Sequence, residues 1–324
     1  MLSLEKAKDL FQEQLDTYII SGQPVELYDP IRYTLSLGGK RIRPVLAIMT
    51  ASIFDENAES VFPAALALEV FHNFTLLHDD IMDNSSLRRN KPTVHVKWNA
   101  STAILSGDAM LILAFQLIQK SDPKSLPKVM DVFTKTALEV CEGQQFDMEF
   151  ESRMDVSEEE YIRMIELKTA VLLAASMKIG AIVGGAASVD ADLLYDAGKS
   201  LGLAFQLKDD LLDTFGNAAK FGKRIGGDII ENKKTYLFIL ARDQADKKDR
   251  EELINLYKSS NENAEEKIRS VRGIFDKTQV QKRTEDKIQE YIQKAYSNCA
   301  MLTSSAETKK ELTKLFDYLI SREN

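Results

Sequence analysis

The sequence lacks several features that mark other classes of protein. All 7 prolines lie at or before Pro127, and the 324 residues include only 15 glycines. Long helices require this scarcity, whereas two-layer β and α/β proteins need frequent turn residues. The two cysteines, Cys141 and Cys299, are too few and too isolated for a disulfide scaffold or a thiolate zinc site. The composition therefore predicts a mostly helical protein without structural disulfides.

Charge and hydropathy exclude further classes. The 50 acidic and 42 basic residues give a net charge of −8, which argues against a nucleic-acid binder. The N-terminus lacks the apolar stretch of a signal peptide, and the most apolar long segment, 171–189, is interrupted by Lys178. Hydrophobic residues make up 44%, enough for a large core. We expect a cytoplasmic protein with no transmembrane segment, folded as a single domain over residues 1–324.

Apolar residues recur with helical spacing along most of the chain. The predicted helical segments are roughly 2–19, 42–54, 60–82, 98–120, 125–149, 158–186, 190–215, 230–258 and 262–320, the last with breaks. Ser157 and Glu160 form the sequence pattern of a capping box at one helix start. The short segments 37–44, 84–95 and 215–234 are basic and rich in Gly or Asn, which is unusual in an acidic protein and indicates a binding role.

Two apolar helices end in the same group of three aspartates, Asp79-Asp-Ile-Met-Asp83 and Asp209-Asp-Leu-Leu-Asp213. The first and last aspartate of each group lie four residues apart, so they project from one helix face about 6 Å apart. Their repulsion costs a few tenths of a kcal/mol, and they oppose the helix dipole. One copy could be a solvated helix end, but two copies indicate a bound cation. Ligand groups made of aspartates alone, with no His or Cys among them, favour Mg²⁺.

The basic segments could hold the anionic ligand that a cation on these aspartates needs to complete its shell. Lys40, Arg41 and Arg43 come after a Gly-Gly pair, which lets backbone amides approach an oxyanion. Arg88 and Arg89 follow Asp83 by five and six residues, so a phosphate bound near the aspartates could also meet a guanidinium. The further candidates are Lys168, Lys223 and Lys233. Each lysine alone could be an ordinary surface residue, so the prediction depends on their places around the two acidic clusters.

From about Leu35 to Thr235 the sequence resembles the trans-isoprenyl diphosphate synthases, or polyprenyl synthetase family. The motifs that carry the resemblance are Gly38-Gly-Lys-Arg-Ile-Arg-Pro44, Leu77-His-Asp-Asp-Ile-Met-Asp83, Arg88-Arg89, Pro92-Thr93, His95, Gly107-Asp108, Gly143-Gln144 with Asp147, Lys168-Thr169, Phe205-Gln-Leu-Lys-Asp-Asp-Leu-Leu-Asp213, Gly222-Lys223 and Lys233. The resemblance implies an all-α isoprenoid synthase fold of about a dozen helices around a deep central cavity, a homodimer, and about three Mg²⁺ ions per active site.

The implied reaction is the Mg²⁺-dependent head-to-tail (1′-4) condensation of isopentenyl diphosphate with an allylic diphosphate. The allylic substrate would be dimethylallyl, geranyl or farnesyl diphosphate, and the product a trans-polyprenyl diphosphate, C20 geranylgeranyl or C15 farnesyl. Charge building on the departing diphosphate needs metal ions and cationic side chains. The carbocation needs a dry, apolar cavity, which the apolar helices before both aspartate clusters could supply.

The resemblance also implies a role for each matching residue. The direct metal ligands are Asp79, Asp83 and Asp209, supported by Asp80, Asp210 and Asp213. The allylic diphosphate is held by Arg88, Lys168 and Lys223, with Lys233 near it. The isopentenyl diphosphate pocket comprises Lys40, Arg43, His72 and Arg89. The groups whose dipoles face the allylic cation are Thr169, Gln206 and the Lys168 carbonyl, while Gln144 and Asp147 line the same mouth. The chain departs from the family pattern at Asn90 and at Glu231-Asn232, where a glycine is usual.

Two other functions compete with this hypothesis. A terpene cyclase shares the first aspartate motif, but its second metal motif mixes Asn/Asp, Ser/Thr and Glu at wider spacing, and it has no use for a second diphosphate pocket. A non-catalytic or regulatory subunit of a heteromeric prenyl synthase tends to lose aspartates, whereas this chain keeps all six. Turnover by the pure protein would distinguish these functions.

The residues before Asp79 are expected to set product length. The family positions of the chain-length stopper fall on Thr75, Phe74 and Phe71. A small Thr75 beside Phe74 favours C20 over C15, and two bulky rings disfavour C30–C50 products. On an ideal helix Phe71 lies within about 80° of Asp79, whereas Phe74 lies about 140° away. Helix geometry therefore favours Phe71 as the cavity floor, and the family position favours Phe74.

Overall fold

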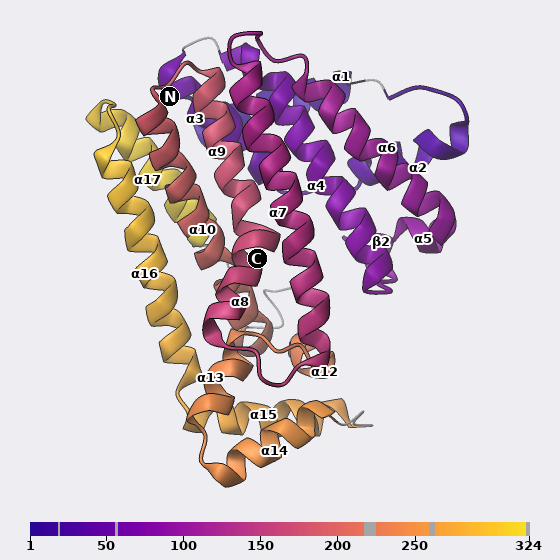
Figure 1. Ribbon diagram of the computed structural model, residues 1–324, viewed down its shortest axis with the longest axis vertical. Coiled ribbons are helices and arrows are strands. Elements are labelled where there is room, and N and C mark those ends of the chain that lie inside the picture. Colours follow the sequence, from indigo (N-terminus) through magenta and orange to yellow (C-terminus); the bar gives the residue numbers. More distant parts are fainter. Residues whose placement is uncertain (19, 56–57, 217–224, 259–262, 322–324) are drawn as a thin grey trace. The chain divides into compact units, whose positions relative to one another are not determined.

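The computed structural model describes residues 1–18, 20–55, 58–216, 225–258 and 263–321 and is almost entirely helical (Figure 1). The chain divides into two compact units. Unit 1 comprises Met1–Thr134 and Ala175–Tyr195, and unit 2 comprises Lys135–Ala174 and Asp196–Asn324. The predicted all-α fold class is confirmed. Folding as one domain over 1–324 stays a prediction.

Unit 1 is built around α4 (Phe62–Met82), which packs on α6 (Ala100–Ile118) and α3 (Ile42–Phe54) (Figure 1). Its other elements are α1 (Leu4–Thr17), α2 (Val25–Ser36), the 3₁₀ helix η1 (Ala58–Val61), the strands β1 (Leu87–Arg88) and β2 (Lys91–Pro92), α5 (Val94–Lys97), the first turns of α7 (Leu126–Ser152), the end of α9 (Val171–Val183) and the start of α10 (Ser188–Phe215). Gly180 lets α9 pack closely on α3, since a Cβ there would lie 2.2 Å from the Ala47 carbonyl oxygen.

Unit 2 holds the remainder of α7, α9 and α10 and all later helices. These elements are α8 (Glu158–Ile165), the π-helix η2 (Glu166–Ala170), α12 (Gly227–Ile230), α13 (Tyr236–Gln244), α14 (Lys247–Lys258), α15 (Ala264–Lys277), α16 (Val280–Met301) and α17 (Ala306–Ile320). Leu207, Phe238 and Phe275 are among the side chains of its apolar core. The predicted capping box is confirmed, with Ser157 and Glu160 each accepting the other's backbone amide.

The predicted helices differ from the structure in several places, among them the four-residue α5, which was not predicted. The sequence analysis missed α2, which tolerates Pro30 in its interior. The predicted continuous helix over 230–258 is wrong, because α12, α13 and α14 replace it and residues 231–235 are not helical. The predicted segment 158–186 is helical to Val183, but its helical ladder widens into a π-helix at Glu166–Ala170. Both 231–235 and the π-helix carry predicted site residues.

Candidate active site

The first aspartate cluster lies at the C-terminal end of α4 in unit 1. Asp80 is only 5% exposed, and its Oδ1 accepts hydrogen bonds from Nε of Arg88 at 2.9 Å and Nη2 at 2.5 Å. The same Nη2 lies 3.5 Å from Oδ2 of Asp79. Burial raises the pKa of Asp80, and the Arg88 guanidinium opposes that shift. Asp79 is half-buried and Asp83 exposed, so the middle aspartate faces inward and the outer two reach the surface.

Arg88 and Arg89 lie on a short hairpin that follows this cluster. Strands β1 and β2 pair antiparallel, with Arg88 opposite Lys91, and Arg89-Asn90 forms the two-residue turn. Both turn residues have positive φ, 54° at Arg89 and 61° at Asn90, as in the turns that best fit a two-residue hairpin. Asparagine tolerates this left-handed conformation better than most residues. The departure at Asn90 is therefore compatible with the same turn.

A second cluster in unit 1 joins residues predicted to hold isopentenyl diphosphate. Nη1 of Arg43 lies 3.1 Å from Nε2 of His72, and Arg41 pairs with Glu69. Because a guanidinium can only donate, His72 Nε2 accepts, which makes the imidazole neutral with its proton on Nδ1. Nη1 of Arg89 donates to the Gly38 carbonyl. Of the predicted pocket, Arg43, His72 and Arg89 are thus brought to one region, and exposed Lys40 stands two residues after Gly38.

This cluster carries a surplus of positive charge. Burial lowers the pKa of His72 well below its ordinary value, and Arg43 and Arg89 lower it further. Burial also lowers the pKa of Arg43 to about 10, partly opposed by Glu69. Several guanidinium groups therefore repel one another around a partly buried, neutral imidazole. An anion bound there would relieve this repulsion, as expected of a diphosphate pocket.

The second aspartate cluster, in unit 2, repeats the pattern of the first. Asp210 is 4% exposed and accepts hydrogen bonds from the Tyr161 hydroxyl at 2.6 Å and from Gln206 Nε2 at 3.0 Å. Burial, reinforced by the charge of Asp228, raises the pKa of Asp210 to about 8. Asp209 is exposed. Oδ2 of Asp213 accepts the backbone amide of Asp228 at 3.0 Å and so helps to hold the start of α12.

Lys168 and Thr169 lie in the π-helix η2. Nζ of Lys168 contacts Oδ2 of Asp147 at 2.5 Å, and Thr169 Oγ1 donates to Gln206 Oε1 at 3.2 Å. Gly143 makes room for the bulge, since a Cβ there would lie 2.2 Å from the backbone nitrogen of Lys168. Single π turns inside helices are frequent at functional sites. The predicted residues Thr169, Gln206 and Asp210 thus form one hydrogen-bonded chain within unit 2, and Lys168, next to Thr169, pairs with the predicted Asp147.

Two predicted lysines remain. Lys223 lies outside the described residues. Lys233 is exposed and forms an ion pair with Glu231 at 3.1 Å. The preceding Asn232 has a left-handed φ of 59°. At this departure from the family pattern, as at Asn90, an asparagine thus adopts a backbone conformation that favours glycine. Its Oδ1 accepts a hydrogen bond from the buried Lys267.

The structure adds two residues that sequence reasoning missed. Tyr161 supports Asp210 from 49 positions away, and Glu69 neutralises Arg41 from 28 positions away. No local motif signals either contact, because the partners meet only through tertiary packing. A buried glutamate within an apolar helix was the available signal for Glu69, since such a group needs a cationic partner.

The aspartates that reach the surface offer only oxygen donors. In the described part of the chain, no three His, Cys, Asp or Glu side chains form a group that could hold a metal. A cation on Asp79, Asp83 or Asp209 would therefore complete its shell with water or phosphate oxygens. Mg²⁺ binds in this way, so the residues present fit this ion.

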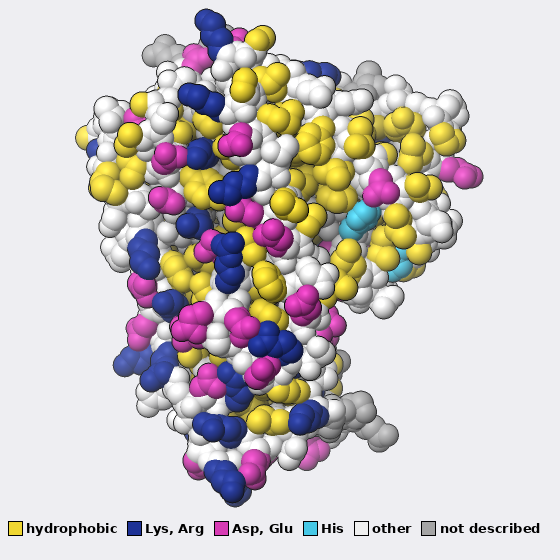
Figure 2. Space-filling model, viewed as in Figure 1, with side chains coloured by type: hydrophobic (Ala, Val, Ile, Leu, Met, Phe, Trp, Pro, Cys, Tyr) yellow, Lys and Arg dark blue, Asp and Glu magenta, His cyan; other side chains and the backbone are white. Residues whose placement is uncertain are grey.

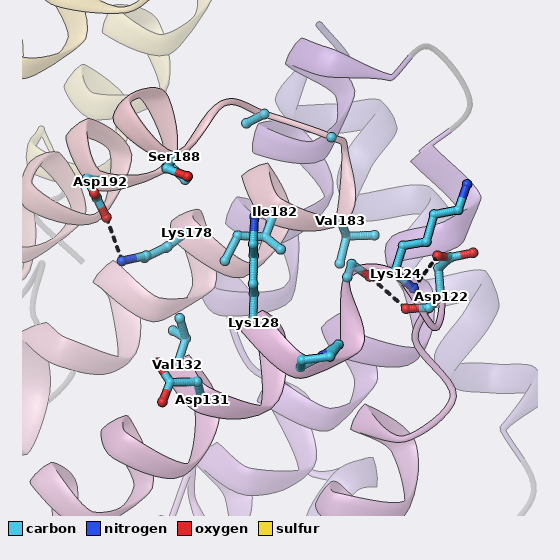
Figure 3. A pocket seen from close by; sticks show the side chains of 15 residues that line it. Asp122, Lys124, Lys128, Asp131, Val132, Lys178, Ile182, Val183, Ser188 and Asp192 are labelled. Carbon is cyan, nitrogen blue, oxygen red and sulfur yellow. Dashed lines mark hydrogen bonds and ion pairs between the residues drawn. The ribbon is translucent and has the colours of Figure 1, made fainter.

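A surface pocket of about 730 Å³ in unit 1 contains none of the predicted site residues (Figure 3). Its charged residues are Lys124, Lys128, Lys178, Asp122, Asp131 and Asp192. Their charges balance, and Lys178 pairs with Asp192 at 2.6 Å. The pocket thus lacks the excess positive charge of the arginine–histidine cluster.

The chain is similar to known proteins over most of its length. Residues 24–275 match the family model described as polyprenyl synthetase. The chain belongs to the polyprenyl synthetase family. It is 40% identical over 311 residues to the geranylgeranyl diphosphate synthase of Methanosarcina mazei, covering 95% of this chain and 94% of that protein. It is 38% identical over 260 residues to the geranylfarnesyl diphosphate synthase of Natronomonas pharaonis, covering 75% and 76%.

The fold is shared as well. A crystal structure of a geranylgeranyl pyrophosphate synthase superimposes with a TM-score of 0.95 at 46% identity, covering 100% of both chains. The predicted family and the isoprenoid synthase fold are therefore confirmed, and the protein is a prenyltransferase. The individual roles assigned to the site residues stay predictions.

Proposed function

We propose that this protein is a Mg²⁺-dependent geranylgeranyl diphosphate synthase. It would condense isopentenyl diphosphate head to tail with dimethylallyl, geranyl or farnesyl diphosphate and stop at C20. The observation that carries this proposal is the shared design of the two aspartate clusters. In each, the middle carboxylate is buried and hydrogen-bonded, at Asp80 and Asp210, while the first, Asp79 or Asp209, reaches the surface. The buried carboxylates are held in place by their hydrogen bonds, and the surface carboxylates beside them are open to a cation.

The bound Mg²⁺ ions, about three by resemblance to the family, would supply the charge that stabilises the departing diphosphate. Asp79, Asp83 and Asp209 would hold them, and Asp80, Asp210 and Asp213 would fix the helix ends. Arg88 and Lys168 carry fixed positive charge beside these clusters and would hold the allylic diphosphate as its charge grows.

The second substrate has a separate pocket in this proposal. Lys40, Arg43, His72 and Arg89 would grip isopentenyl diphosphate, whose diphosphate does not leave. The neutral imidazole of His72 and the mutual repulsion of the arginines support an anion here. Because this pocket has no use in a terpene cyclase, it favours a chain-elongating enzyme.

Product length would be set on α4. The Phe71 and Phe74 rings lie 5.6 Å apart, and Phe71 also meets Phe133 at 5.4 Å. Phe71 is 1% exposed, whereas Phe74 is 8% exposed and keeps a surface that a prenyl chain could meet. Phe74 would therefore be the stopper, with Phe71 behind it and the small Thr75 leaving the neighbouring position open. The name of the Methanosarcina mazei relative agrees with C20.

The protein would act in the cytoplasm as a homodimer. Two helices, Glu59–Met82 and Ala100–Ile118, are long and apolar enough to cross a membrane by length and composition, a test that core helices of soluble proteins also pass. On α6, Ile104, Leu105 and Ile112 are 46–60% exposed, and hydrophobic side chains gather over this helix in Figure 2. A second copy covering this face would explain its apolarity without a membrane.

The deciding experiment incubates the purified protein with Mg²⁺, labelled isopentenyl diphosphate and each allylic primer separately, and identifies products by mass spectrometry. Geranylgeranyl diphosphate made without a second polypeptide is the expected result. No turnover until another polypeptide is added would favour the subunit function. Hydrocarbon released from an allylic diphosphate alone would favour the cyclase.

A further inference from the structure

The hairpin that carries Arg88 and Arg89 is too short to hold its own shape. Each strand has two residues, and Leu87 is 61% exposed. Isolated two-stranded hairpins are at best marginally stable in water. Both arginines therefore depend on contacts from outside the hairpin for a fixed position.

One set of such contacts comes from Asp80 on α4 and from the residues between α4 and β1. Thr93 donates its backbone amide to the Ser86 carbonyl at 3.1 Å and its hydroxyl to the Ser85 carbonyl at 2.8 Å. Arg88 itself pairs with Asp80. These contacts hold the base of the hairpin and its first strand.

The second set comes from Tyr33 on α2. Its hydroxyl donates a hydrogen bond of 2.7 Å to the carbonyl of Pro92, the last residue of β2. Its ring meets the edge of Trp98 with centroids 5.3 Å apart, and Nζ of Lys97 lies 3.8 Å above the same ring. One side chain thus contacts both the end of the hairpin and the helix turn that follows it.

We infer that Tyr33 is a positioning residue that holds the Arg88–Arg89 hairpin in the geometry required for diphosphate binding. This inference rests on the proposed function, in which Arg88 holds the allylic diphosphate and Arg89 holds isopentenyl diphosphate. Tyr33 touches neither substrate in this scheme. It acts by fixing β2, and through β2 the turn at Arg89.

The test uses Tyr33→Phe, which removes the hydroxyl and keeps the ring contacts with Lys97 and Trp98. Losing one hydrogen bond of average net strength should raise the KM for isopentenyl diphosphate about fivefold, with kcat within about twofold of wild type. Tyr28→Phe is the matched control, because it makes the same change on the same helix and should alter neither constant. Circular dichroism melts check that all variants are folded.

A second measurement separates positioning from general stability. If Tyr33 acts through Arg89, then adding Tyr33→Phe to Arg89→Ala should produce no further rise in that KM. A full additional fivefold rise in the Arg89→Ala background would overturn the inference. So would a Tyr33→Phe enzyme with wild-type KM values.

Calorimetry with isopentenyl diphosphate in the absence of an allylic substrate tests the same step without turnover. Weaker diphosphate binding by Tyr33→Phe than by Tyr28→Phe supports the positioning role even if the wild-type protein makes no prenyl product. Equal binding by the two variants contradicts it. Failure of the proposed function would appear instead as absent turnover by the wild-type protein.

Discussion

Replacement of Phe74 by alanine should lengthen the product by one isoprene unit. Phe74 lies five residues before Asp79, about 7.5 Å along the α4 axis, whereas Phe71 lies about 12 Å away. Phe74 contacts the rings of Phe71 at 5.6 Å and His78 at 4.8 Å. A phenyl ring and one isoprene unit are close in size, so removal of one ring shifts the expected product from C20 to C25.

The stability cost limits how the experiment is designed. Truncating a buried phenylalanine to alanine costs about 3–5 kcal/mol, which includes the contacts of its ring with neighbouring aromatics. Phe71 is 1% exposed and sits between Phe74 and Phe133, so Phe71→Ala should lie near the upper end. Phe74 is 8% exposed and should cost less. Phe11→Ala on α1 removes a ring that is 0% exposed and controls for general loosening.

The assay extends farnesyl diphosphate with labelled isopentenyl diphosphate and separates the products by chain length. We expect C25 from Phe74→Ala, mainly C20 from Phe71→Ala, and longer chains from the double variant. C25 from Phe71→Ala alone would make Phe71 the stopper. Unchanged C20 from all three variants, or equal lengthening by Phe11→Ala, would refute the idea that this part of α4 measures the chain.

Three further predictions concern the charged groups. Asp79→Ala or Asp209→Ala should lower kcat by at least ~10³ while the protein stays folded, and more than a tenth of wild-type activity in Asp79→Ala would contradict the metal site. Arg43→Ala should mainly raise the KM for isopentenyl diphosphate, whereas Arg88→Ala should lower kcat. An Arg43→Ala enzyme that is altered only in its KM for the allylic substrate would contradict this assignment of the two pockets. The pKa of His72 lies well below 6.5 in the folded protein, so the unfolded chain binds a proton that the folded chain does not, and stability falls as the pH drops below 6.5. Urea titrations of His72→Asn should show a shallower loss of stability below that pH, and an unchanged slope would contradict a neutral imidazole at His72 in the folded protein.

The sequence predicted the long helices well because their apolar residues recur at helical spacing over many turns. α2 escaped detection because Pro30, which usually ends a helix, lies within it. Tertiary packing supplies the compensation, since Pro30 is buried and Ile31 is fully buried. A local pattern cannot show that a neighbouring core will outweigh one lost backbone hydrogen bond.

The candidate site was also predictable only in part from local sequence patterns. Motif spacing placed Asp79, Asp80 and Arg88 together, and the structure joins them through hydrogen bonds. It could not predict which aspartate of each motif turns inward, because that depends on distant partners. Tyr161 reaches Asp210 across 49 positions, and Tyr33 reaches Pro92 across 59.

The non-helical segment 231–235 also depends on a partner that is distant in sequence, and it gives a last prediction. Asn232 holds a left-handed φ of 59°, and its Oδ1 accepts a hydrogen bond from Lys267, which is 3% exposed. Burial lowers the pKa of Lys267 because it disfavours the charged form, and the hydrogen bond to the Asn232 amide oxygen stabilises that charged form. Asn232→Gly would suit the backbone but remove that acceptor, with a net cost of about 1.5–3 kcal/mol for a hydrogen bond to a charged group.

Asn232→Gly should therefore destabilise the protein, whereas Asn90→Gly, at an exposed left-handed position, should be neutral or stabilising. Lys267→Met removes the charge and keeps the apolar stem. In that background Asn232→Gly should cost little, so the double-mutant cycle should show a coupling of at least about 1 kcal/mol in urea unfolding. Additive losses would mean that the two side chains do not support each other. Coupling would mean that a buried lysine fixes the turn before Lys233, where the family pattern relies on glycine.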